Sequence, residues 1–285
     1  MEAAFAELPL ALFTTLAPMG AGAFVALALA FFTTSFSGDQ LKKIDKMTLI
    51  PLVVVLLGFA ASFAHLAAPL HAAGVFAGVG SSPLSNEILV GSLFVVVALV
   101  YTVAALAGKL SDGARKGFAA VVAVMAVVFA CFTGMAYMME TIPSWNTPFV
   151  PVQLLGFALV GGIPLGTLVL GLAGSLGEAL KGSFKTAAIA VAVIGVLLAV
   201  VGLCFQIMGV NELVNPLVAG ADLVAGVAIW IAVAVVCLIV SALVSVVSLT
   251  GKSPVALAAT SSVIALAGIF IARLVFYAVQ MSVGL

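Results

Sequence analysis

Eight long apolar stretches follow one another along the 285-residue chain, separated by polar residues or by clusters of proline and glycine. An α-helix needs about 20 apolar residues to cross the hydrocarbon core of a bilayer. Backbone groups in lipid must satisfy their own hydrogen bonds, which favours helices over irregular chain. The pattern therefore predicts an all-α membrane protein, a bundle of eight transmembrane helices over residues 9–34, 47–69, 87–108, 118–139, 150–174, 184–208, 223–249 and 255–280.

The composition leaves little room for any soluble part. Hydrophobic residues make up 65% of the chain and charged residues 7%, whereas about 25% of a typical soluble domain is charged. These values exclude a soluble enzyme, a disordered chain and a protein that binds nucleic acid. We expect one integral-membrane domain over residues 1–285. The first residues include Glu2 and Glu7 but no basic residue, so we expect them to belong to the first helix rather than to a signal peptide.

Basic residues occupy alternate connections between the predicted helices. The connections near residues 70–86, 140–149 and 209–222 contain no lysine or arginine. Cytoplasmic loops carry an excess of these residues, so the alternation predicts that both termini lie outside and that four basic connections are cytoplasmic. The basic residues in those four connections are Lys42, Lys43, Lys46, Lys109, Arg115, Lys116, Lys181, Lys185 and Lys252.

Polar side chains at membrane depth are expected mostly in the outer half of the bundle, and the inner half is expected to contain little beyond the basic residues. Ionisable groups in a membrane protein usually mark a functional site, so the asymmetry predicts a site that faces the outer leaflet. Arg273 lies inside the last predicted helix. It either faces protein, a ligand or a carboxylate such as Glu87 or Glu140, or reaches outward to the lipid headgroups.

The histidines and cysteines of the sequence give little indication of a redox cofactor within the protein. His65 and His71 stand at one end of one predicted helix, whereas a haem with two histidine ligands needs them on opposite faces; a haem with one histidine and another ligand stays open. Cys131, Cys204 and Cys237 lie in separate predicted helices, whereas an iron–sulfur cluster generally needs four cysteines. We therefore expect these cysteines to be buried and expect no metal site.

Several motifs are similar to one known family. They include the stretches SFAHLAAPLHA from Ser62 to Ala72 and GVGSSPLSNEILVGSLF from Gly78 to Phe94. Three further stretches match the family pattern, namely LPLALFTTLAPMGAGAF near the start, Y-x5-P-x-W-x-T-P from Tyr137 to Pro148, and R-x-x-F-Y-x3-M-x-V-G from Arg273 to Gly284. Together they resemble the membrane-anchor subunit of dimethyl sulfoxide reductase, the DmsC family. The sixth and seventh predicted helices contain no motif of this pattern.

The resemblance implies a location, partners and a substrate. Such anchors lie in the cytoplasmic membrane of prokaryotes, bind menaquinol at the outer leaflet, and hold a four-cluster iron–sulfur subunit and a molybdopterin catalytic subunit on the outer face. The resemblance ties the histidine of the H-L-x-x-P motif, His65, to quinol binding. It makes Glu87 of the S-N-E motif a candidate for proton handling.

The chemistry of quinol oxidation agrees with these roles. The reaction releases two electrons and two protons, and histidine is the side chain best suited to accept a proton in such a reaction, which makes His65 a candidate base. Ser85, Asn86 and Tyr137 can orient the quinol oxygens, and a cation at Arg273 favours an ionised Glu87. Trp145 is either an interfacial anchor or a wall of the same pocket.

Two alternatives stay open. The protein is either an anchor of a related quinol-linked reductase, for polysulfide, thiosulfate or nitrite, or a small-solute secondary transporter. The transporter needs midplane polar groups and broken helices, for which GGIP at Gly161–Pro164 is the one hint.

Overall fold

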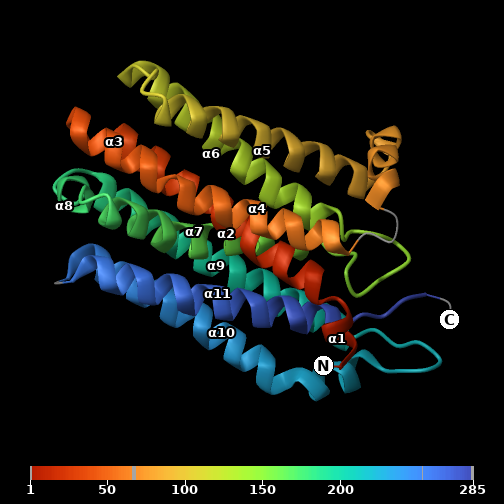
Figure 1. The fold of residues 1–285 in the computed structure, drawn as a ribbon. Helices are drawn as coiled ribbons and strands as arrows, with labels where there is room; N and C mark the ends of the chain where they lie inside the picture. Colours follow the sequence, from red (N-terminus) through yellow and green to blue (C-terminus); the bar gives the residue numbers. More distant parts are fainter. Residues whose placement is uncertain (1, 66–68, 252, 284–285) are drawn as a thin grey trace.

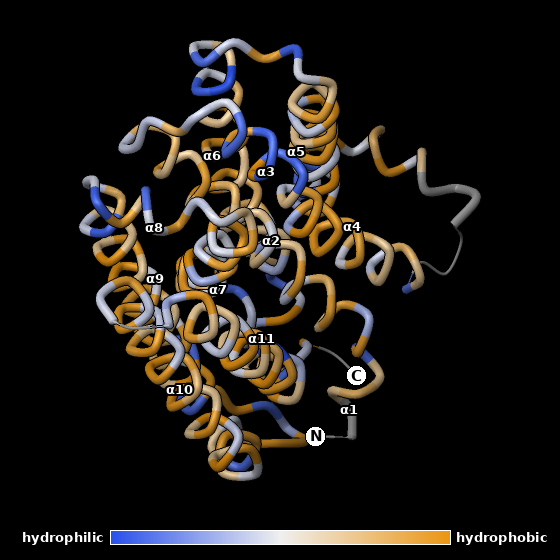
Figure 2. Tube along the Cα trace, turned by 60° about the vertical axis from the view of Figure 1, so that its left-hand side comes forward, coloured by the Kyte–Doolittle hydropathy of each residue, from blue (hydrophilic) through white to orange (hydrophobic). Residues whose placement is uncertain are grey.

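The computed structural model describes residues 2–65, 69–251 and 253–283. Within these ranges eight helices are long and apolar enough to cross a membrane, as the sequence predicts. They lie side by side in one bundle (Figure 1), and hydrophilic residues gather near the helix ends (Figure 2). The helices are α2 (Leu8–Thr33), α3 with α4 (Gly38–Met47 and Leu49–Ala64), α5 (Pro83–Leu106), α6 (Asp112–Met135), α7 (Phe149–Leu172), α9 (Phe184–Asn211), α10 (Gly220–Thr250) and α11 (Pro254–Ala278).

The second span differs most from its predicted limits of 47–69. It begins at Gly38, because Ser37 and Gln40 form a capping box that starts α3 well before the apolar stretch. It ends at Ala64, and His65 is its C-cap residue. The short helices α1 (Glu2–Ala6), η1 (Pro69–Gly78) and α8 (Leu176–Ala179) were not predicted as separate elements.

The connections divide between the two ends of the bundle as the alternation of charge predicts. Helix α1, the described residues that follow α11, η1 and the connections 136–148 and 212–219 lie at one end, which we call the terminal end (Figure 1). The connections from α2 to α3, from α5 to α6 and from α7 to α9 lie at the other, which we call the basic end (Figure 1). The connections without lysine or arginine thus share one end of the bundle.

Helices α2 and α7 form the centre of the bundle. In their most apolar 18-residue stretches, 78% and 83% of the sequence is buried inside the protein. They approach closely where Gly22 meets Gly162, since a Cβ atom on Gly22 would lie 1.7 Å from the Ala158 carbonyl oxygen. Small residues allow such close backbone contact between membrane helices. The GGIP stretch therefore has a packing role, and α7 continues unbroken through Pro164.

The basic end contains more buried polar chemistry than predicted. Asp45 of α3 and Arg115 of α6 form a buried ion pair, with side chains 5% and 7% exposed. The Arg115 guanidinium also lies 5.8 Å from the centre of the Phe31 ring. The expectation that Arg115 is only a loop charge is wrong, because α6 begins at Asp112 and so places Arg115 inside the helix, facing α3.

Candidate functional site

Arg273 is fully buried in the half of the bundle near the terminal end. Its Nε donates to Thr14 Oγ1 of α2 at 2.8 Å, and its Nη2 donates to the Tyr277 hydroxyl one turn further along α11 at 3.2 Å. The guanidinium lies 3.9 Å from the centre of the Phe276 ring. Of the alternatives for this residue, the structure therefore selects a side chain that faces protein rather than the lipid headgroups. No carboxylate forms an ion pair with it among the described residues.

Tyr137 and Trp145 belong to the same cluster, although both lie outside the helices. The predicted fourth helix, 118–139, extended past Tyr137, whereas α6 ends at Met135 and the backbone then turns. The Tyr137 hydroxyl lies 2.6 Å from that of Tyr277. Burial, followed by the neighbouring Tyr277 hydroxyl, raises the pKa of Tyr137 well above its ordinary value. The phenol is therefore protonated at neutral pH and can donate a hydrogen bond.

Trp145 is 6% exposed, so the interfacial-anchor interpretation is wrong. Its indole nitrogen donates to the Phe276 carbonyl oxygen at 3.0 Å, and its ring stacks on the Phe276 ring at 4.9 Å. These contacts fasten the connection 136–148 to α11. Trp145 therefore supports the ring that lies against the Arg273 guanidinium.

Glu87 lies on the buried face of α5, with 6% of its surface exposed. It faces Thr133 of α6, and Arg273 and Tyr137 are close enough to act on it electrostatically. Among the described residues, neither Glu87 Oε1 nor Arg273 Nη1 has a hydrogen-bond partner. Buried polar atoms are nearly always paired, so the Glu87 carboxyl and the Arg273 guanidinium each have hydrogen-bonding capacity that no described residue satisfies.

Four phenylalanines, one from each of α2, α4, α5 and α6, form an aromatic stack one helix turn from Glu87. The rings of Phe59 and Phe94 each stack on Phe129, at 5.5 Å and 5.4 Å. Phe13 meets Phe59 edge to face at 5.3 Å. Gly91, one turn after Glu87, leaves room for the Phe59 ring, because a Cβ atom there would lie 2.9 Å from it. The polar groups therefore border an aromatic core, in which Phe94 and Phe129 are fully buried and Phe59 is half-buried.

His65 stands apart from this cluster at the end of α4. Its Nε2 lies 3.4 Å from Glu7 Oε2, and the two side chains are 38% and 30% exposed. The predicted pair His65 and Glu87 shares no hydrogen bond or ion pair within the described ranges. The side chain of His71 lies outside the described residues.

Ser85 and Asn86 lie at the start of α5 and organise the backbone that leads into it. Asn86 Oδ1 accepts a hydrogen bond from the Gly80 backbone nitrogen at 2.7 Å. Gly80 has a φ of +89°, a conformation that glycine adopts without strain. The Ser85 hydroxyl packs against Gly78, where a Cβ atom would lie 2.6 Å from Oγ. Both side chains therefore contact the segment that precedes them.

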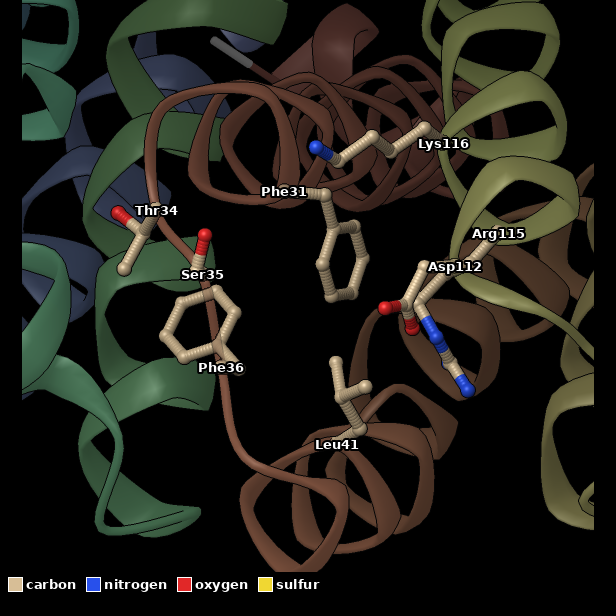
Figure 3. Close-up of a pocket in the computed structure, with 8 residues that line it drawn as sticks. All are labelled: Phe31, Thr34, Ser35, Phe36, Leu41, Asp112, Arg115 and Lys116. Atoms are coloured by element: carbon tan, nitrogen blue, oxygen red, sulfur yellow. The ribbon is translucent and has the colours of Figure 1, made fainter.

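Two pockets lie at the ends of the bundle, and neither is lined by His65, Glu87, Tyr137, Trp145 or Arg273. The pocket at the basic end measures about 70 Å³ and is walled by Phe31, Phe36 and Leu41 (Figure 3). That volume is below the roughly 300–1,000 Å³ of ligand pockets. The pocket at the terminal end measures about 510 Å³ but has no ionisable side chain in its lining, which is formed by Pro143, residues 213–218 and residues 280–283.

The remaining expectations concern cysteines and metals. Cys204 is exposed on the bundle surface, and Cys131 and Cys237 are half-buried. The prediction that all three are buried is therefore wrong, because a helix in lipid can turn an apolar thiol outward. Within the described ranges no three His, Cys, Asp or Glu side chains gather where they could hold a metal ion.

The sequence did not indicate that Thr14, Thr133, Glu7 or the four phenylalanines would lie at the candidate site. The threonines lie in ordinary apolar helices, and both hydroxyls bond to backbone carbonyls of their own helix, so no local pattern distinguishes them. Tyr277 had a usable signal. It stands four residues after Arg273, which places both side chains on one helix face.

Comparison with known proteins shows which family the sequence belongs to. The sequence profile of the family described as DMSO reductase anchor subunit (DmsC) matches residues 1–279. The C subunit of anaerobic dimethyl sulfoxide reductase from Escherichia coli (strain K12) is 31% identical over 291 residues, covering 100% of this protein and 99% of the relative. The C subunit of the Haemophilus influenzae enzyme is 29% identical over 60% of this protein and 61% of its own length. The YnfH subunit of an Escherichia coli anaerobic dimethyl sulfoxide reductase is 28% identical over 58% of this protein and 57% of its own length. With eight candidate membrane helices in its described part and a match over nearly its full length, the chain belongs to the DMSO reductase anchor subunit (DmsC) family.

Proposed function

We propose that this protein anchors a DMSO reductase-type molybdopterin oxidoreductase in the cytoplasmic membrane and oxidises menaquinol for anaerobic respiration. The observation that carries the proposal is that Glu87 Oε1 and Arg273 Nη1, both in the half of the bundle near the terminal end, are buried without a hydrogen-bond partner among the described residues. A quinol presents a hydroxyl that can donate to a carboxylate. A quinone presents a carbonyl that can accept from a guanidinium. The two orphaned atoms match these two needs.

Each residue of the proposed site has its own role in quinol oxidation. Menaquinol supplies two electrons and two protons when it is oxidised. Glu87 accepts a hydrogen bond from the substrate, and Arg273, held by Thr14 and Tyr277, donates one. The protonated Tyr137 stabilises Tyr277 through their short hydroxyl contact. Phe59, the half-buried member of the phenylalanine stack, provides an apolar contact for the quinol ring. His65, which is partly exposed, takes up a proton close to the water interface.

The partners follow from the electron balance and from the family. The protein offers no metal ligand set within its described ranges, so the electrons pass to a partner that carries its own redox centres. We propose a four-cluster iron–sulfur subunit, followed by a molybdopterin catalytic subunit. Both dock at the terminal end, which we place outside because its connections contain no lysine or arginine.

Replacing His65 by alanine tests the function. We expect turnover of the assembled complex with menaquinol to fall roughly 100-fold or more, since general-base help is worth about 10²–10⁴-fold. Turnover with a reduced viologen dye, which delivers electrons directly to the soluble subunits, should be unchanged. Phe63→Ala, at an exposed residue two positions away, is the matched control. Wild-type menaquinol turnover in His65→Ala would reject the proposal.

Cross-linking tests the docking side. Leu217 is 74% exposed in the connection 212–219, and Lys181 is an exposed residue at the basic end. We expect a photo-reactive group on Leu217→Cys to capture the iron–sulfur subunit, and the same group on Lys181→Cys to capture neither soluble subunit. Capture from Lys181→Cys alone would place the partner on the opposite side and overturn the proposed orientation.

Related reductases are the alternative for the terminal acceptor, because an anchor never touches it. The family match and the curated relatives favour dimethyl sulfoxide over polysulfide, thiosulfate or nitrite. The transporter alternative loses its one sequence hint, since GGIP packs α7 against α2 without breaking the helix.

A further inference from the structure

We propose that Glu7 is a positioning residue for His65, an inference that rests on the proposed quinol oxidation. Its carboxylate holds the imidazole with Nε2 protonated and directed at Glu7, and thereby leaves Nδ1 free to accept a proton from the quinol. The contact that carries this proposal is the 3.4 Å approach of Glu7 Oε2 to His65 Nε2.

The fold holds Glu7 in place from two directions. Helix α1 packs against α11, and Ala4 is fully buried in the same apolar cluster as Tyr137, Trp145 and Tyr277. At Glu7 the backbone leaves α1 and enters α2, where the Glu7 carbonyl oxygen accepts the first bond of the helix, from the Ala11 nitrogen at 2.9 Å. Glu7 is therefore fixed between the Arg273 cluster and the end of α4.

The Glu7 side chain is not used by the helix that it begins. Residues at this position commonly turn their side chain onto the first backbone N–H groups, but the Glu7 carboxylate makes no such bond. Its Oε2 is a buried atom that has no hydrogen-bond partner among the described residues, and His65 Nε2 lies 3.4 Å from it. A carboxylate in this arrangement is available to orient an imidazole.

The chemistry follows the general logic of a base oriented by a third group. A neutral imidazole has one nitrogen that donates and one that accepts, so a carboxylate at Nε2 selects the form whose Nδ1 accepts. When a quinol is oxidised, both O–H bonds break and two electrons leave for the iron–sulfur partner. One proton goes to His65 Nδ1 and then to water at the exposed face of the ring; the other goes to Glu87. The Glu7 carboxylate stabilises the imidazolium.

The test uses the assembled complex and a soluble naphthoquinol as donor. We expect Glu7→Gln, which preserves the shape but removes the charge, to lower kcat about 10-fold while KM stays within about twofold. Glu7→Asp should recover part of the loss because it restores the carboxylate. Glu212→Gln, the same change at an exposed acid of the terminal end, is the matched control and should leave kcat unchanged. Viologen-linked turnover should be unchanged in all three variants.

A His65→Ala background separates positioning from an independent role. There, Glu7→Gln should lower kcat no further, because the group that it orients is gone. A full additional loss of kcat in that background would overturn the assignment. A parallel loss of viologen-linked turnover would also overturn it, because the contact would then stabilise the fold instead of orienting the imidazole. A normal kcat for Glu7→Gln beside a strong His65→Ala defect would overturn the Glu7 assignment alone. Normal turnover in His65→Ala would overturn the proposed function and Glu7 with it.

Discussion

Gly22→Ala should prevent the folded protein from accumulating in the membrane. The added Cβ would lie 1.7 Å from the Ala158 carbonyl oxygen and 2.6 Å from the carbonyl carbon. Both are backbone atoms, so the obstacle cannot rotate away, and α2 and α7 would have to separate along the centre of the bundle. Overpacking a core typically costs about 1–3 kcal/mol and occasionally more, and we expect about 3 kcal/mol or more here because the displaced element is a whole helix.

The measurement is the amount of protein in isolated membranes, together with its thermal unfolding midpoint in detergent. Gly226→Ala is the control, since nothing lies within 4 Å of a Cβ atom there. Alanine in a helix interior is roughly 0.5–1 kcal/mol better than glycine, so Gly226→Ala should equal or exceed the wild type in stability. Equal levels of the Gly22→Ala and Gly226→Ala proteins would show that α2 and α7 do not meet at this contact.

Arg273→Met should remove both menaquinol turnover and much of the stability of the terminal end. The change deletes the bonds to Thr14 and Tyr277 and the contact with the Phe276 ring. Hydrogen bonds to charged groups contribute about 1.5–3 kcal/mol each, so we expect a loss of about 3 kcal/mol after methionine fills part of the space. Arg273→Lys should not restore turnover, because one ammonium cannot reach both partners and the substrate in the geometry of a guanidinium.

Lys181→Met serves as the control for Arg273→Met. Lys181 makes an exposed ion pair with Glu178, and surface pairs contribute about 0–1 kcal/mol. Stability is read from thermal unfolding of the purified complex, and turnover is compared between menaquinol and a viologen dye. If Arg273→Met loses stability but oxidises menaquinol at the wild-type rate, the guanidinium supports the fold and does not contact the substrate.

Hydropathy predicted the number of helices and the alternation of their connections because both depend on local composition. The residues at which helices begin and end were harder to predict from hydropathy, since they depend on capping. Ser37 began α3 far ahead of the apolar stretch, and α6 ended before Tyr137. The capping box was readable in the sequence as a serine three residues before a glutamine, but the apolar pattern alone does not include it.

The proximity of the candidate residues was predicted in part. Tyr137, Trp145 and Arg273 do meet in one cluster, and Glu87 lies close enough to act on it. Which faces of the helices meet could not be predicted, because Arg273 and Thr14 are 259 positions apart and no local pattern couples them. Likewise the contact of His65 with Glu7 depends on the break between α1 and α2, which hydropathy does not mark.

The bond between Thr14 and Arg273 can form only late in the synthesis of the bundle. Thr14 enters the membrane with the first long helix and Arg273 with the last, so every other long helix is made before the guanidinium reaches its partner. Domains begin to fold from the N-terminal end as they are made, yet here the first and last long helices must meet. The contact between Thr14 and Arg273 can therefore form only after α11 has been made, and polypeptides that terminate before α11 lack it.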